Sequence, residues 1–419
     1  MLESPINMNI GFISEYFPPY APGGAEWSAF FLARNLSRKG HNVIVITPNY
    51  GDLQEESNDG VKVVRFPFYS KLDKNKLILS SFYHTNPLGI IWSSLQIYKY
   101  SRKNKVKLLH VQGKYSILPA FLANLLLKLP IVLTVRDYQI ICNYGFCLYS
   151  KNRACNIIDY FTKDFTFYLK EYIDKKSISV LLINFSYAIW GRLYRNFLKM
   201  FTSNMNIVVL SKKQKEIFLS NGYKKVWVIG NSTNFLSDIK NQKKERKLLF
   251  AGRLSDGKGV NLLIKIIPDF FEKYPKYKII FAGEGKLKKK LIKLKKKYPN
   301  IVVLGQIDHS TLANLYKKSM IVVVPSIWHE PFGRIALESL AAITPVVVTN
   351  RGGLPEIIKD KHWGYVVEPE SAKLFEAIEK AIKNNKSLVE TIKKDYSFIK
   401  NKFGDRITKK YLSIYKAIL

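Results

Sequence analysis

Two carboxylates and two cations stand at spacings that suit chemistry on a charged, hydroxyl-rich substrate. Glu330 and Glu338 are separated by seven residues in PSIWHEPFGRIALESL, directly after an apolar stretch. Arg253 and Lys258 lie five residues apart in the glycine-rich segment AGRLSDGKG. Carboxylates accept hydrogen bonds from sugar hydroxyls, and paired cations neutralise charge that builds on a departing diphosphate. We therefore predict that these four residues share one site.

Each of these segments follows an apolar strand and precedes a helical pattern. The strand at 247–251 leads into the loop with the two cations, and the strand at 321–325 leads into Glu330. Loops of this kind gather at the carboxyl edge of a parallel sheet, where doubly wound proteins bind their ligands. Backbone N–H groups near Phe332 and Gly333, at the start of the next helix, would bind an anion or a hydroxyl there.

Continuous apolar strands alternate with helical patterns along the whole chain. They are predicted at 9–14, 42–47, 61–66, 108–111 and 131–135, and then at 207–210, 226–229, 247–251, 278–282, 301–304, 321–325 and 345–349. Uninterrupted apolar strands are typical of parallel sheets that are covered on both faces. The sequence predicts an α/β protein with two doubly wound, Rossmann-like domains, residues 1–205 and 206–399, and a ligand cleft between them.

The composition is that of a globular protein with a strong excess of basic residues. The 419 residues include 67 Lys and Arg against 32 Asp and Glu, which leaves a net charge of +35. Such an excess favours polyanionic partners, namely nucleic acid, anionic lipid headgroups or phosphorylated substrates. No stretch reaches the roughly 20 apolar residues of a membrane span, and the first residues do not read as a secretory signal.

The small number of cysteines bears on the cellular compartment of the protein. Three cysteines, Cys142, Cys147 and Cys155, are too few for a disulfide framework and indicate a reducing compartment. They lack a nearby histidine, so we expect no metal site. We expect a cytoplasmic protein, with peripheral binding to the inner face of the cell membrane as a further hypothesis.

The segment at about 160–200 is rich in aromatic and basic residues and has two interpretations. Its helices either pack into the core of the first domain or form an interfacial segment. In the second interpretation apolar side chains face lipid, and Arg192, Arg195 and Lys199 face headgroups. The Lys-rich stretch 286–297 is interpreted as a solvated helix that covers the sheet, with anionic membrane contact as the alternative.

Together these motifs resemble the retaining nucleotide-sugar glycosyltransferases of family 4, which have the GT-B fold. The resemblance rests on GRLSDGKG, the spacing of Glu330 and Glu338, GGAE at 23–26 and TPVVVTNRGGLPE at 344–356. It extends from the first strand to the last helix. It implies transfer of a sugar from a UDP-sugar or GDP-sugar to an acceptor hydroxyl, with no metal and no other cofactor. A lipid-linked glycan or a cell-envelope polysaccharide is the expected acceptor.

The resemblance also implies roles for residues of the second domain. Arg253 and Lys258 would hold the donor diphosphate and assist its departure. Glu330 and the backbone at Phe332–Gly333 would hold the transferred sugar. Glu338 would hold the nucleotide ribose, and a final helix at about 400–419 would cross back onto the first domain.

In the first domain the resemblance is less regular. Gly23 and Gly24 would let their loop approach the phosphates closely, which a Cβ would obstruct. In LTVRDYQ, Arg136 stands where the family pattern T-x-H-D has its histidine, next to Asp137. We place both on the acceptor side of the cleft. His110 is the other candidate on that side, with a buried structural role as its alternative.

Two other function classes are weighed against the transferase. A nucleotide-sugar epimerase of the same fold would need a carboxylate and histidine set for proton chemistry at the sugar. A non-enzymatic basic protein that binds membrane or nucleic acid would explain the charge but would leave Arg253, Lys258 and Glu330 without a role. We therefore expect an enzyme whose partners are a nucleotide-sugar and an acceptor glycan, not nucleic acid.

Overall fold

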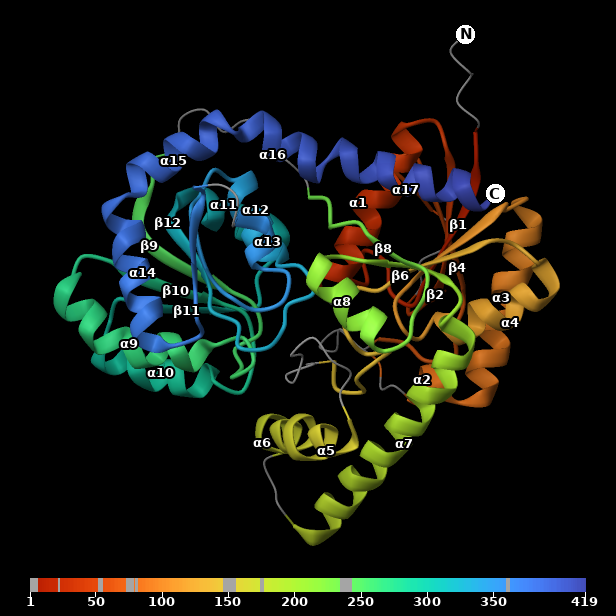
Figure 1. Cartoon of the computed structure of the whole chain (residues 1–419), viewed down its shortest axis with the longest axis horizontal. Coiled ribbons are helices and arrows are strands. Elements are labelled where there is room, and N and C mark those ends of the chain that lie inside the picture. Colours follow the sequence, from red (N-terminus) through yellow and green to blue (C-terminus); the bar gives the residue numbers. More distant parts are fainter. Residues whose placement is uncertain are drawn as a thin grey trace.

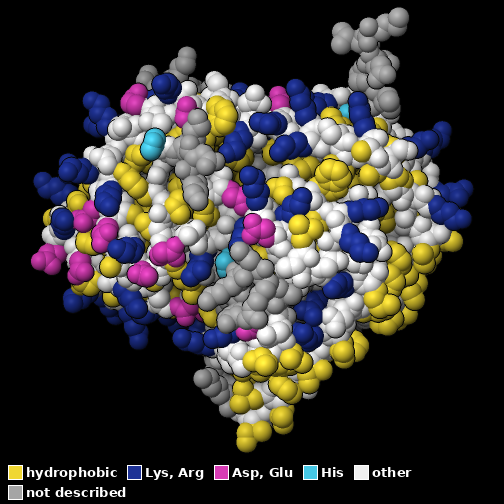
Figure 2. Space-filling model, in the orientation of Figure 1, with side chains coloured by type: hydrophobic (Ala, Val, Ile, Leu, Met, Phe, Trp, Pro, Cys, Tyr) yellow, Lys and Arg dark blue, Asp and Glu magenta, His cyan; other side chains and the backbone are white. Residues whose placement is uncertain are grey.

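Two α/β domains lie side by side in the computed structural model (Figure 1). The structure describes residues 7–21, 23–51, 56–72, 79, 82–145, 156–173, 177–233, 243–358 and 362–419. Helices α15 (Asn385–Lys394), α16 (Tyr396–Phe403) and α17 (Asp405–Ile418) run from the second domain to the first along the upper edge of Figure 1. Lys and Arg side chains are spread over both domains on the face that Figure 2 shows.

The first domain is built on an eight-stranded sheet with the order β3-β4-β2-β1-β5-β6-β7-β8. Its strands are β1 (Asn9–Ser14), β2 (Asn42–Asn49), β3 (Glu56–Asn58), β4 (Val61–Pro67), β5 (Leu108–Gln112), β6 (Ile131–Thr134), β7 (Asn206–Val209) and β8 (Val226–Val228). All pairs are parallel except β3 with β4. Its helices are α1 (Gly24–Arg38), α2 (Phe82–Thr85), α3 (Pro87–Lys103), α4 (Ile117–Leu127) and α8 (Lys212–Ser220).

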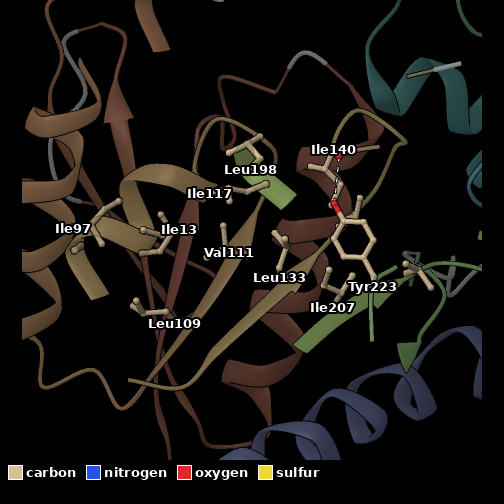
Figure 3. Packing of buried hydrophobic residues seen from close by; sticks show 14 of the residues in the cluster. Ile13, Ile97, Leu109, Val111, Ile117, Leu133, Ile140, Leu198, Ile207 and Tyr223 are labelled. Carbon is tan, nitrogen blue, oxygen red and sulfur yellow. Dashed lines mark hydrogen bonds between the residues drawn. The ribbon is translucent and has the colours of Figure 1, made fainter. Parts of the chain in front are cut away.

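Both faces of this sheet are buried, which explains why its strands read as continuous apolar runs. In β2, Val43 and Val45 belong to one apolar cluster, and Ile44 and Ile46 belong to another. Successive side chains of a strand point to opposite faces, so each face of the sheet carries its own apolar layer. Figure 3 shows the layer that contains Ile13, Val111, Leu133 and Ile207.

The predicted division at residues 205 and 206 is wrong for the sheets. Strand β7 pairs with β6, with Leu133 opposite Ile207, and β8 pairs with β7. The change from the first sheet to the second therefore falls between β8 and β9. The sequence could not show this, because a strand that follows a helix has the same apolar pattern whichever parallel sheet it joins.

The second domain has a six-stranded, fully parallel sheet with the order β11-β10-β9-β12-β13-β14. Its strands are β9 (Glu245–Ala251), β10 (Lys278–Ala282), β11 (Ile301–Gly305), β12 (Ser319–Val324), β13 (Val346–Thr349) and β14 (Gly364–Val367). Its helices are α9 (Val260–Lys273), α10 (Lys288–Lys297), α11 (His309–Lys318), α12 (Arg334–Ala341), α13 (Pro355–Ile358) and α14 (Ser371–Lys383). The prediction of two doubly wound domains is confirmed.

The last helix and one carboxylate of the second domain help to fix the two domains against each other. Ile407, Tyr411 and Tyr415 of α17 pack into the apolar cluster of β1 and α1, so the last helix crosses back as expected. The Glu356 carboxylate of the second domain accepts hydrogen bonds from the N–H groups of Lys212 and Lys213, each at 2.9 Å. A carboxylate is favoured at the N-terminus of α8 by the helix dipole.

A helical insertion stands between β6 and β7. It consists of α5 (Ile157–Asp159), a π-helix (Tyr160–Phe165), α6 (Thr166–Tyr172) and the 25-residue α7 (Ile178–Thr202). In Figure 1 the insertion lies below the two sheets, and α7 projects away from the first domain. Among the described residues, no helix is both long and apolar enough to cross a membrane.

Candidate active site

The loop that follows β9 is held against the end of β12, and this brings the predicted donor residues together. Gly259 is the N-cap of α9 with a φ of +74°, and a Cβ there would lie 1.8 Å from the carbonyl oxygen of Pro325. Only glycine fits this approach. It places Lys258 beside the segment that carries Glu330, although 72 residues separate the two in sequence.

Glu330 is the centre of a compact polar network. Its Oε1 accepts hydrogen bonds from Lys258 Nζ at 2.5 Å, Ser326 Oγ at 2.6 Å and Trp328 Nε1 at 2.9 Å. Lys258 Nζ also lies 4.6 Å from the centre of the Trp328 ring. Burial alone would raise the pKa of Glu330, but the Lys258 charge and the three donors outweigh it and lower that pKa. Glu330 is therefore a carboxylate at neutral pH.

These residues line a cleft of about 960 Å³ between the domains. Arg253, Lys258 and Glu330 form part of its second-domain wall, and Arg136 and Asp137 form part of its first-domain wall. The structure thus brings together five of the predicted site residues. Because parallel strands of both sheets end at this cleft, its position agrees with the expected ligand site.

Arg136 is held in place by amide side chains. Its Nε and Nη2 donate to Gln112 Oε1 at 3.2 and 3.0 Å, and its Nη1 donates to the Asn231 side-chain oxygen. Burial lowers the pKa of this guanidinium and raises the pKa of Asp137. Both side chains lie at the end of β6.

A smaller cavity of about 80 Å³ lies beside this wall, at the carboxyl ends of β1, β5 and β6. Glu15, Glu26, Arg136 and Asp137 all contribute to its lining. Burial raises the pKa of Glu15 to about 7, and burial also raises the pKa of Glu26. Ser116 Oγ donates to Glu15 Oε2 at 3.0 Å. The sequence analysis did not identify Glu15. Its position directly after the apolar strand β1 was the available signal, because the predicted donor residues also follow apolar strands.

Glu338 lies deeper than its predicted role suggests. Its carboxylate accepts from Arg334 Nε at 2.6 Å and from Tyr316 Oη at 3.0 Å, and His309 Nε2 lies 3.4 Å from it. Trp27 of α1 stacks on His309 with 5.5 Å between ring centres. Burial opposes ionisation, but the Arg334 charge and the hydrogen bonds of His309 and Arg334 lower the pKa of Glu338. The described lining of the cleft does not include Glu338.

Phe332 and Gly333 adjoin the cleft through Pro331, which lines it. Gly333 is the N-cap of α12 with a φ of +106°, and a Cβ there would lie 2.5 Å from Leu354 Cδ2. Glycine has no side chain that could cap the first N–H groups of α12. Phe332 itself is buried and packs against Phe403.

Gly23 and Gly24 lie at the start of α1, opposite α12. The carbonyl oxygen of Gly24 accepts a hydrogen bond from Arg334 Nη1, and a Cβ on Gly24 would lie 2.9 Å from Arg334 Cδ. Gly23 N donates to Glu26 Oε2 at 3.0 Å. The loop thus lies against the Arg334 side chain, one residue beyond Gly333, and its predicted approach to the donor phosphates stays a prediction.

The placement of His110 on the acceptor side is wrong. His110 is fully buried in β5, where Nδ1 lies 2.6 Å from Tyr415 Oη and Nε2 lies 2.7 Å from Thr134 Oγ1. Burial holds its pKa well below the usual range, so it is neutral. Its role is structural, because it ties β5 and β6 to α17. A histidine within an otherwise apolar strand was the signal for this alternative.

Ser326 and Trp328 both donate to Glu330, and the sequence analysis assigned neither of them a role. It also missed Glu171 of α6, whose Oε1 accepts from Asp256 N at 3.0 Å. This contact joins the helical insertion to the donor loop. No local pattern could have indicated it, because 85 residues separate the partners.

Within the described ranges, no group of three or more His, Cys, Asp or Glu side chains could hold a metal ion. Cys142 is buried, and its Sγ donates to Asp164 Oδ2 at 3.1 Å. Cys147 and Cys155 lie outside the described residues.

Comparisons with known proteins place this geometry in a family. The profile of "Glycosyltransferase Family 4" matches residues 22–234, and that of "Glycosyl transferases group 1" matches residues 232–398. An uncharacterized glycosyltransferase of Methanocaldococcus jannaschii is 27% identical over 98% of each chain. One of the subunits of human phosphatidylinositol N-acetylglucosaminyltransferase is 26% identical over 90% of this chain and 69% of its own length.

Solved structures show the same fold. Sucrose-phosphate synthase from Thermosynechococcus elongatus superposes with a TM-score of 0.67 at 18% identity and covers 98% of this chain and 99% of its own. HepE from Anabaena, solved in complex with UDP and glucose, gives a TM-score of 0.65 at 17% identity and covers 99% of this chain and 100% of its own. From its two matched profiles and its two-domain architecture, this chain belongs to glycosyltransferase family 4, among the group 1 glycosyl transferases, and has the GT-B fold.

Proposed function

We propose that this glycosyltransferase moves a sugar from a UDP-sugar or GDP-sugar to an acceptor hydroxyl with retention of configuration and without a metal ion. The observation that carries the proposal is the 2.5 Å pair of Lys258 and Glu330 in the cleft, with Arg253 on the same wall. A diphosphate suits the two cations, and sugar hydroxyls suit the ionised carboxylate.

The residues of the second-domain wall would also activate the donor. The bond between sugar C1 and the diphosphate oxygen breaks, and the acceptor oxygen forms its bond to C1 on the same face. The acceptor proton leaves on the departing diphosphate. Lys258 and Arg253 stabilise the charge that develops on that diphosphate, and the first N–H groups of α12 supply further donors. Glu330 orients the sugar.

The relatives support the choice of donor and acceptor. HepE was solved with UDP-glucose, and the human relative is named for transfer to phosphatidylinositol. We propose a nucleoside diphosphate sugar as donor and a lipid-linked glycan or cell-envelope polysaccharide as acceptor. The protein would then work in the cytoplasm at the inner face of the cell membrane.

A panel of UDP-sugars and GDP-sugars tests the proposal. We expect one donor to raise the Tm and to yield a transferred sugar whose anomeric configuration, read by NMR, equals that of the donor. Lys258→Ala should lose both effects, and Lys289→Ala, on the exposed side of α10, should keep them.

Three outcomes would contradict the proposal. Inversion at C1 would exclude retention. An epimerised sugar released without any acceptor would indicate the epimerase. A Tm raised by an oligonucleotide and by no nucleotide-sugar would favour the non-enzymatic basic protein.

A further inference from the structure

Helix α7 carries an apolar stripe that faces solvent. Seven large apolar side chains recur along it every three or four residues, which places them on one side of the helix. They are Ile178, Leu182, Phe185, Ile189, Leu193, Phe197 and Met200, and each exposes at least 43% of its surface. Stripes of this kind normally face a protein core.

A second apolar surface adjoins α7. Leu88, Ile91, Trp92 and Leu95 of α3 line an open groove of about 620 Å³, and α4 exposes Leu125 and Leu126. The two surfaces meet where Phe121 of α4 packs on Phe201 of α7, with 4.5 Å between ring centres. In Figure 2 apolar side chains gather along the lower right edge and at the bottom of the molecule. We call the exposed side chains of α3, α4 and α7 the apolar–basic face.

The charges around this face have one sign. Residues 82–128 include seven Lys and Arg but no Asp or Glu. In the described part of the insertion, the carboxylates of Asp159, Asp164 and Glu171 are buried. Lys163 and Lys170 are exposed there. The face therefore presents apolar groups and cations to its surroundings.

The other side of α7 belongs to the active-site cleft. Tyr187, Trp190 and Tyr194 line the cleft together with Lys258 and Glu330. One helix thus connects the apolar–basic face with the proposed reaction centre. The Glu171 contact to Asp256 ties the same insertion to the donor loop.

We propose that the apolar–basic face docks on an anionic lipid bilayer, with α7 lying in the headgroup region, and that a lipid-carried acceptor enters the cleft along α7. Apolar side chains enter the boundary between headgroups and acyl chains, and the surrounding cations bind anionic headgroups. A second copy is a poor occupant, because two chains of net charge +35 repel each other. The inference deepens the proposed function by identifying where the acceptor comes from.

Co-sedimentation of the full chain with vesicles tests the docking. We expect binding to phosphatidylglycerol–phosphatidylcholine vesicles and none to pure phosphatidylcholine at low salt. Ile178→Ser, Leu182→Ser and Leu193→Ser combined should reduce binding roughly tenfold or more, since each removes apolar surface from the interface. Ile292→Ser, Leu304→Ser and Phe398→Ser, which alter exposed apolar residues of the second domain, should not.

Two double charge-reversal variants distinguish an effect of the position of the cations from an effect of the net charge. Lys99→Glu with Lys103→Glu, both exposed on α3, should weaken binding, whereas Lys289→Glu with Lys296→Glu on α10 changes the net charge equally and should leave it intact. Arg195 is avoided, because its Nη1 donates to the carbonyl of Ile141 at 2.9 Å. Circular dichroism and Tm verify that each variant is folded.

Equal vesicle binding by all four variants would overturn the proposal, as would indifference of the unmodified chain to both vesicle types. Concentration-dependent dimers lost only in the apolar variant would also overturn it, in favour of a second copy. The vesicle assay contains no nucleotide-sugar, and donor binding is measured without vesicles. Loss of donor binding would therefore count against the proposed function and leave the docking result standing.

Discussion

The pKa values of buried carboxyls on the two sides of the cleft are shifted in opposite directions. On the second-domain side, Glu330 lies in the cleft wall next to Lys258, and Glu338 lies outside the cleft lining next to Arg334. These cations lower the pKa of both carboxyls. On the first-domain side, burial dominates and raises the pKa values of Asp137 in the cleft wall and of Glu15 and Glu26 in the adjoining smaller cavity. The second domain pairs its buried carboxylates with cations, whereas the first domain buries its acids with less compensation of their charge.

This difference suggests a division of work within one cleft. A wall with compensated charges is already organised for a diphosphate, since its cations need no rearrangement when the charge develops. Acids whose ionised form is disfavoured by burial suit neutral, hydroxyl-bearing ligands better than anions, because carboxyl oxygens accept hydrogen bonds from hydroxyls. The donor would thus bind the second domain, and the acceptor would approach the first.

Removal of Lys258 is expected to have the largest effect. Lys258→Ala should lower turnover by about 10²–10⁴-fold, the scale for loss of one preorganised charge partner. The measurement is the rate of sugar transfer at saturating donor. Lys289→Ala is the matched control, because it removes an exposed lysine of the same domain.

If Lys258→Ala retained near-normal turnover while folded, the second-domain wall could not be the site of leaving-group stabilisation. The difference in pKa shifts between the two sides would then not indicate where the donor binds.

Glu15 should produce a smaller effect on stability that depends on pH. Unfolding returns its carboxyl to an ordinary pKa of 4.5, and folding raises it to about 7. The folded state therefore holds the proton longer, and the stability of the protein falls as the pH rises from 4.5 through 7. Glu15→Gln removes this loss and should stabilise the protein by roughly 2–3 kcal/mol at pH 8, with little gain at pH 4.5.

Thermal unfolding at both pH values checks this expectation. Glu376→Gln, at an exposed position of α14, is the control and should show no such pH dependence. A Glu15→Gln variant that is less stable than the unmodified protein at pH 8 would mean that Glu15 is ionised and paired in the fold.

Chelation should have the smallest effect of all. In the proposed mechanism Arg253 and Lys258 supply the charge that a divalent ion would otherwise provide, so excess EDTA should leave the transfer rate unchanged within about twofold. The assay compares rates with EDTA and after readdition of Mg²⁺ or Mn²⁺. Strict recovery by a metal would place the diphosphate in a different arrangement.

Most of the fold could be predicted from the sequence, since buried parallel strands leave long apolar runs. The exceptions have physical causes. Strand β3 (ESN) has only polar residues, and β14 (GYVV) begins with a glycine and is half-buried, so neither shows the pattern of a buried strand. The sheet membership of β7 depends on the pairing of Ile207 with Leu133, and no local pattern encodes that contact.

The site was predicted in part. The sequence predicted that Lys258 and Glu330 share one site, because both follow strands; their hydrogen bond and the pairing of β9 with β12 that brings them together were not predicted. The partners of Glu338 were not predicted, because Tyr316 and His309 come from a different helix, α11. The role of His110 depends on Tyr415, which lies 305 residues away. Contacts at such distances are set by packing rather than by local sequence.

Calorimetric titration with UDP and GDP tests the division of the cleft most directly. It compares the unmodified protein with Lys258→Ala on the second-domain wall and Asp137→Asn on the first. We predict that Lys258→Ala weakens the nucleoside diphosphate roughly tenfold or more, because truncation of a charge partner leaves the diphosphate unpaired. Asp137→Asn should leave the Kd nearly unchanged. Unaltered affinity in Lys258→Ala, or a loss confined to Asp137→Asn, would contradict the account.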